Sequence, residues 1–181
     1  MNNYMYLTGK RAQKASQYKI DSKVKNNVLA SYAKMLDENK SLIIKENIKD
    51  INYAKKIGLK ENLINRLHLN EKKINNIRSS ITSIIRFKDP VDHVLEKWKR
   101  PNGLNISRVS IPIGVIGVIY ESRPNVTSDV AGLCFKSGNA VILRGGSEAI
   151  NSNRILSKLF RKALKKNKVD ENFIQFIDSK N

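Results

Sequence analysis

Apolar side chains recur every three or four residues through the first half of the chain, from about Lys10 to Phe87. This spacing predicts helices, because it lays the apolar side chains along one face of each. A helix over 48–57 would end at Gly58, and one over 71–87 at Asp89-Pro90. We expect these helices to form one antiparallel layer, residues 1–88, without chemistry of its own. The longest stripe follows an expected N-cap at Asp21-Ser22 and comprises Val24, Val28, Leu29, Tyr32, Met35, Leu36 and Ile43.

After residue 88 the pattern changes to short apolar runs separated by helical spacing. Strands are expected at 115–120, 140–143 and 173–177, with helices at 126–136 and 151–166 between them. Ahead of them, a turn at Pro101-Asn102-Gly103 precedes a β-like stretch at 104–109. Strands that alternate with helices over short connections are typical of a doubly wound parallel sheet. We therefore expect an α/β fold, with an N-terminal helical layer (1–88) followed by half of a Rossmann-like sheet (89–181).

The expected sheet is incomplete. Its first strand, 115–120, is a nearly continuous β-branched run, which is typical of a strand buried on both faces. Its third strand lies within a few residues of the last one in the sequence, so an apolar edge would stay uncovered. Either another chain supplies the missing strands, or the sequence is the front portion of a longer protein.

Charge is the most unusual feature of the composition, with a formal net value of +18 over 181 residues. A surface that binds nucleic acid would show clustered charge. The lysines are instead spread almost evenly from Lys10 to Lys180, as they are on solvated surfaces. The pattern therefore favours solvent exposure over a basic nucleic-acid-binding module, and we expect no nucleic-acid partner.

The remaining composition points to a cytoplasmic protein. The one cysteine, Cys134, allows no intramolecular disulfide. No window has the apolar length of a signal peptide or a membrane span, so we expect no membrane partner. His68 and His93 fit no metal-ligand motif, and we expect no metal site.

Two loops follow the first two expected strands, where open α/β sheets bind ligands. The loop 120–125 opens a helix that Asn125 or Thr127 could cap, with backbone amides facing an anion. The loop 144–148 pairs two glycines, Gly145 and Gly146, with the guanidinium of Arg144, which suits a phosphate or ribose. Neither the GxGxxG nor the Walker fingerprint is present. The pattern alone leaves a nucleotide site and a structural glycine turn equally open.

Two runs of sequence carry a much more specific signal. The first is PIGVIGVIYESRPNVT, residues 112–127, and the second is CFKSGNAVILRGGSEA, residues 134–149. Both closely resemble γ-glutamyl phosphate reductase, also called glutamate-5-semialdehyde dehydrogenase, of the aldehyde dehydrogenase superfamily. The resemblance spans essentially the whole chain but less than half of the family protein, its N-terminal portion.

The resemblance implies NADPH-dependent reduction of L-glutamate 5-phosphate to L-glutamate 5-semialdehyde, in proline biosynthesis. It implies that Arg144 contacts the adenosine ribose or its 2′-phosphate, with Gly145, Gly146, Ser147 and Glu148 beside it. It makes Asn125 the expected donor to the oxyanion and Arg123 a donor to the substrate carboxylate or phosphate. The alternatives for Asn125 and Arg123 are a helix cap and a surface arginine.

The family's nucleophilic cysteine belongs to a later catalytic domain, which we expect to lie outside these 181 residues. Cys134 matches a packing cysteine of the family, so we expect a chain that is inactive alone. The resemblance also implies a homo-oligomer at full length and a functional link to glutamate 5-kinase. The reductase part of a bifunctional pyrroline-5-carboxylate synthase and an inactive scaffold fragment stay open as alternatives.

Overall fold

The computed structural model describes residues 3–121 and 123–178, which form an α/β fold. Helices make up the first half: α1 (Asn3–Ser16), α2 (Ser22–Glu38), α3 (Lys40–Lys56), α4 (Glu61–Leu67) and α5 (Glu71–Arg86). Two strands follow, β1 (Val94–Lys99) and β2 (Asn105–Val109). The remainder alternates strand and helix: β3 (Val115–Ile119), α6 (Pro124–Lys136), β4 (Ala140–Arg144), α7 (Ile150–Lys166) and β5 (Ile174–Phe176), with short 3₁₀ turns η1 (Ser147–Ala149) and η2 (Glu171–Phe173). The α/β class and its order, helices before a partial parallel sheet, are confirmed.

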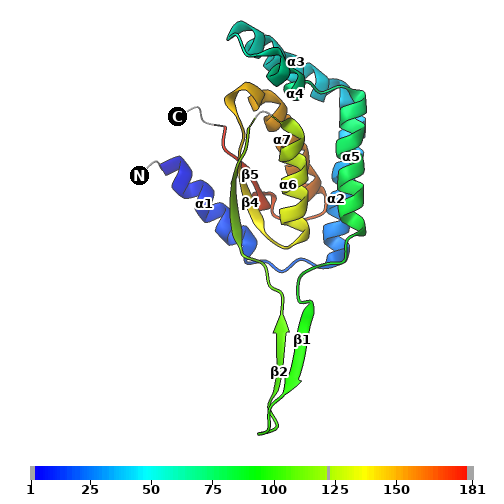
Figure 1. The fold of residues 1–181 in the computed structure, drawn as a ribbon, viewed down its shortest axis with the longest axis vertical. Helices are drawn as coiled ribbons and strands as arrows, with labels where there is room; N and C mark the ends of the chain where they lie inside the picture. Colours follow the sequence, from blue (N-terminus) through cyan, green and yellow to red (C-terminus); the bar gives the residue numbers. More distant parts are fainter. Residues whose placement is uncertain (1–2, 122, 179–181) are drawn as a thin grey trace.

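Three parallel strands form the sheet within the described residues, in the order β3-β4-β5. Helices α6 and α7 cover one face, and α1 covers the other (Figure 1). The expectation that the 115–120 strand is buried on both faces is wrong, since the Ile119 side chain is 87% exposed. The reason is its edge position: α1 lies mainly over β4, and among the described residues no strand pairs with the outer side of β3.

The N-terminal helices do not form one layer, contrary to expectation. Helix α1 packs against the sheet, whereas α2 and α5 pack on the outer side of α6 and α7 (Figure 1). The apolar stripe from Val24 to Ile43 also belongs to two helices, because α2 ends at Glu38 and α3 begins after Asn39. There the Asn39 side-chain amide donates to the Met35 carbonyl oxygen at 2.7 Å, which competes with continuation of the helix. Helix α3 therefore starts at Lys40, earlier than the expected residue 48, and ends before Gly58, whose φ of +70° suits glycine.

Strands β1 and β2 form an antiparallel hairpin arm that projects from the body of the molecule (Figure 1). Of these two strands, only β2 coincides with a β-like stretch expected from the sequence, residues 104–109. The sequence of β1, VLEKWK, has every side chain exposed, so no buried face imposes an alternating pattern. At the root of the arm, the buried Lys25 ammonium contacts Asp89 Oδ2 at 2.9 Å. Burial alone would raise the pKa of Asp89, but hydrogen bonds from Lys25 and the Val91 N–H lower it.

One apolar core joins the N-terminal helices to the sheet. The ring centroids of Tyr32 in α2 and Phe160 in α7 lie 4.4 Å apart in a tilted arrangement, and the Tyr32 hydroxyl is hydrogen-bonded to Ser128 Oγ of α6 at 2.6 Å. Phe135 then links Phe160 to Phe173 through edge-to-face contacts. The division into segments 1–88 and 89–181 stays a prediction, and the two segments share this core.

Helix α3 is fixed to the start of α7 by a buried carboxylate, Asp50. Its Oδ1 accepts from the Asn151 backbone N–H at 3.1 Å and from the Asn151 amide at 2.8 Å. Its Oδ2 accepts from the Ser152 backbone N–H at 2.8 Å and from Ser152 Oγ at 2.6 Å. Asn47, one turn earlier, donates to Ser152 Oγ at 2.9 Å and accepts from the Leu69 N–H at 2.8 Å. Asp50 thus caps α7 from another helix.

Replacing Asp50 by asparagine should lower the free energy of unfolding by about 2–4 kcal/mol, because an NH₂ group would then face buried donors. Urea denaturation measures the change. The control is Asp37→Asn, which removes an exposed i,i+3 pair with Lys40 and should leave the urea midpoint unchanged. Equal midpoints for the two variants would contradict the capping role of Asp50.

Candidate functional site

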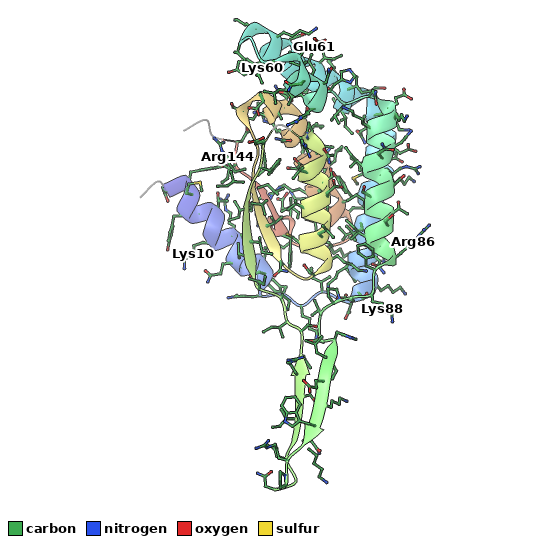
Figure 2. All side chains as sticks on the ribbon, in the orientation of Figure 1. Lys10, Lys60, Glu61, Arg86, Lys88 and Arg144 are labelled. Carbon is green, nitrogen blue, oxygen red and sulfur yellow. The ribbon has the colours of Figure 1, made fainter. Side chains whose placement is uncertain are left out.

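The two loops expected to bind ligand lie side by side at the carboxyl edge of the sheet. The Tyr120 N–H donates to the Arg144 carbonyl at 3.0 Å, just beyond the paired strands β3 and β4. Figure 2 shows Arg144 at the end of the sheet away from the hairpin arm. Ser122, in the first of these loops, lies outside the described residues. Parallel strands place their carboxyl ends together, which explains why the end-of-strand rule located this edge.

Arg144 is the last residue of strand β4 and lies at this edge of the sheet. Its side chain is half-buried, and Nη1 donates to the Ile177 carbonyl at 3.4 Å, at the end of β5. The guanidinium therefore lies over the strand ends, and a guanidinium is a group that suits a phosphate. Ser147 and Glu148 follow in the η1 turn, where Ser147 Oγ donates to Glu148 Oε2 at 3.4 Å.

The glycines of the loop differ in what surrounds them. A Cβ on Gly145 would overlap the Asn153 amide nitrogen and approach the Tyr120 ring at 3.0 Å. A Cβ on Gly146 would overlap only the Glu148 carboxylate, the far end of a flexible side chain. Gly145 is thus required by close packing, whereas the backbone of Gly146 is covered on its Cβ side by the flexible Glu148 side chain.

Behind Gly145, a buried hydrogen-bond network joins β3, α6 and α7. Thr127 Oγ1 donates to Asn153 Oδ1 at 2.9 Å, so the Tyr120 hydroxyl, 2.6 Å from Thr127 Oγ1, is the donor in their contact. Burial raises the pKa of Tyr120 to about 12, which keeps this hydroxyl protonated. Asn153 is fully buried, and its Nδ2 has no partner among residues 3–121 and 123–178.

The expected capping of α6 by Asn125 or Thr127 is wrong. Arg123 occupies the N-cap position without a side-chain bond, and Pro124 starts the helix. Thr127 turns inward to the network behind Gly145, while the Asn125 amide donates to Asp129 Oδ2 at 3.1 Å. Arg123 and Asn125 are both exposed at the start of α6, and their roles stay predictions.

Asp50 also occupies the N–H groups at the start of α7. A helix N-terminus after a parallel strand is the usual phosphate site of dinucleotide-binding folds. Here the Asn151 and Ser152 N–H groups of α7 already bind the Asp50 carboxylate. A phosphate at this edge would therefore contact the loop 144–148 and the Arg144 guanidinium rather than the α7 amides.

Cys134 lies in α6 with 8% of its surface exposed, and burial raises the pKa of its thiol to about 11. A neutral, enclosed thiol is a poor nucleophile. Among the described residues, no group of three or more His, Cys, Asp or Glu side chains could hold a metal ion. In the described part of the chain, no helix is long and apolar enough to cross a bilayer.

The sequence pattern alone did not lead us to the buried polar residues Asn47, Asp50 and Asn153, although the sequence contains a signal for them. The buried stripe of α3 is Ile43, Asn47, Asp50 and Ala54, which is helical spacing with polar residues in its middle. Polar side chains on an otherwise apolar face need buried partners. Starting the expected helix at residue 48 split this stripe and hid the signal. Asn153 similarly lies on the buried side of α7.

Comparison with solved structures defines the class of fold. An acetylating aldehyde dehydrogenase from Geobacillus thermoglucosidasius superposes with a TM-score of 0.70 at 13% identity, over 99% of this chain and 37% of that one. No protein-family model matches the chain. The chain therefore shares the fold of the corresponding part of that aldehyde dehydrogenase, with helices followed by a partial parallel sheet.

Proteins more similar in sequence are γ-glutamyl phosphate reductases. Over 175 residues the chain is 47% identical to a γ-glutamyl phosphate reductase from Caldanaerobacter subterraneus, covering 96% of this chain and 42% of the relative. Crystal structures of γ-glutamyl phosphate reductase from Thermotoga maritima (39% identity, TM-score 0.94) and Saccharomyces cerevisiae (30%, 0.91) each cover 97% of this chain, and 43% and 46% of their own chains. The chain is a homologue of γ-glutamyl phosphate reductase that corresponds to its N-terminal portion. It spans about two fifths of the length of these relatives.

The packing of the glycine loop predicts unequal effects of alanine at its two positions. Gly145→Ala should lower the free energy of unfolding by about 1–3 kcal/mol, because Asn153 and Tyr120 are held in a buried network and must move. Gly146→Ala is the matched control and should be tolerated, since Glu148 can rotate away. Thermal and urea unfolding of both variants measure the difference. Equal destabilisation would contradict this account of the loop.

Proposed function

We propose that the chain forms the adenosine end of an NADPH site and one wall of the acyl-substrate site of a γ-glutamyl phosphate reductase. The reaction is the reduction of L-glutamate 5-phosphate to L-glutamate 5-semialdehyde in proline biosynthesis. The observation that carries the proposal is the sheet edge itself, where Arg144 and the glycine loop adjoin the start of α6 in a homologue of this enzyme. The substrate would come from a glutamate 5-kinase, and a homo-oligomer is proposed for the full-length enzyme.

The residues of the loop 144–148 fit the adenosine ribose of NADP. The backbone at Gly146 has no side chain of its own to hold a ligand away. The Arg144 guanidinium suits a 2′-phosphate, and Ser147 and Glu148 offer partners for a ribose hydroxyl. A glyceraldehyde-3-phosphate dehydrogenase from Methanocaldococcus jannaschii, solved in complex with NADP, shares the fold with a TM-score of 0.71 at 18% identity. NADPH would supply the hydride for the reduction.

The start of α6 would serve the acyl group. One Asn125 amide N–H already bonds Asp129, which orients the group and leaves the second N–H for an oxyanion. The exposed guanidinium of Arg123 would bind the phosphate that leaves. A cysteine nucleophile in a catalytic domain completes the reaction in this family. Because Cys134 is a buried neutral thiol, we expect this chain by itself to bind NADPH without forming semialdehyde.

Replacing Arg144 by methionine should weaken NADPH binding by roughly ten- to a hundredfold, the effect of losing a charge-assisted contact. Binding of NADH, which lacks the 2′-phosphate, should change little. Nucleotide fluorescence titration of this chain measures both affinities. The control is Arg86→Met, which removes the same charge from an exposed position at the far end of α5 (Figure 2).

Two outcomes would contradict the proposal. If Arg144→Met and Arg86→Met weaken NADPH binding equally, the loss reflects the lower net charge of the chain and not a contact between Arg144 and the 2′-phosphate. Semialdehyde formation by this chain alone would show that the nucleophile is present after all.

A further inference from the structure

A pocket of about 260 Å³ lies between α5 and the first two turns of α6. Its apolar lining includes Leu69 and Ile77, both buried. Arg66 and Lys73 line it from the α4–α5 side, and Asp129 lines it from α6. The pocket thus combines an apolar lining with opposite charges on facing elements.

The carboxylate of Asp129 is incompletely satisfied. Its Oδ2 accepts from the Asn125 amide at 3.1 Å. Its Oδ1 is shielded from water and has no hydrogen-bond partner among the described residues. Burial raises the pKa of Asp129, as expected for a carboxylate without a cationic partner. Because Asp129 lines the pocket, a ligand that brings a positive charge into it would lie beside this carboxylate and compensate its charge.

The basic side of the pocket is held ready for an anion. The Lys73 ammonium donates to the Asn65 and His68 carbonyls at 2.9 and 2.7 Å, which fixes it and leaves one N–H. Arg66 is exposed, and the described residues give it no carboxylate partner. A ligand carboxylate can therefore bind here without displacing an existing ion pair.

We propose that this pocket binds the amino-acid head of the substrate, with its α-ammonium on Asp129 and its α-carboxylate on Arg66 and Lys73. The inference rests on the proposed function, which supplies a glutamyl substrate. Asn125, proposed to contact the reacting carbonyl, lines the same pocket one helical turn from Asp129, about 6 Å along α6. That spacing matches the reach of a glutamyl side chain from carbonyl to α-amino group, and its methylenes would lie against Leu69 and Ile77.

Three small probes separate the two charges of the head. L-Glutamate carries both, glutarate lacks the ammonium, and 4-aminobutanoate lacks the α-carboxylate. Each would be titrated into the ¹⁵N-labelled chain at pH 7 and followed through backbone amide shifts. We expect L-glutamate to shift the amides of Lys73, Asn125 and Asp129, and to bind roughly tenfold or more tightly than either analogue.

Two variants assign the charges. Asp129→Asn should remove the preference for L-glutamate over glutarate while the preference over 4-aminobutanoate remains. Arg66→Met, at an exposed position, should remove the preference over 4-aminobutanoate while the preference over glutarate remains. Asp37→Asn, exposed on another helix, is the control and should change neither preference.

The proposal is overturned if L-glutamate and glutarate bind equally, if Asp129→Asn retains the preference between them, or if no amide of the pocket shifts at saturating probe. These readouts do not involve NADPH. Failure of the proposed cofactor site would therefore appear as absent NADPH binding with these preferences intact. Failure of the amino-acid pocket would appear as intact NADPH binding without these preferences among the three probes.

Discussion

The capping of α7 by Asp50 is the interaction on which the arrangement of the site depends. It joins residues about a hundred positions apart and places a carboxylate on the N–H groups that start α7. With Asn47 it also ties the α3–α4 region to the same turn. The 3₁₀ turn that follows the glycine loop runs directly into this capped end, so the loop is positioned by α3 as well as by the sheet.

Helix α6 gives the two halves of the site a common support. Its inward side carries Thr127, which bonds Tyr120 and Asn153 behind the glycine loop. Its outward side carries Asn125 and Asp129, which line the pocket against α5. If cofactor and substrate bind as proposed, both lie on elements fixed to one helix, which favours a constant distance between the hydride donor and the acyl carbon.

The elements that bury an apolar face were predictable from sequence. The expected strand at 140–143 and helix at 151–166 match β4 and α7 to within one residue at each end. Strand β1 was missed because nothing buries it, and the exposure of Ile119 could not be foreseen because it depends on which neighbouring strands are present. The position of the loop 144–148 at the carboxyl edge of the sheet follows from its place directly after a strand. Its support by Asp50 and Asn153 depends on packing between distant segments, which local patterns do not encode.

The most direct test of this account is a map of where NADPH contacts the chain, obtained from backbone amide shifts during titration. The account predicts the largest shifts at residues 144–148, with Asn151 and Ser152 nearly unchanged because their N–H groups remain bonded to Asp50. Large shifts at Asn151 and Ser152, with little change at 144–148, would place the phosphate on α7 and contradict it.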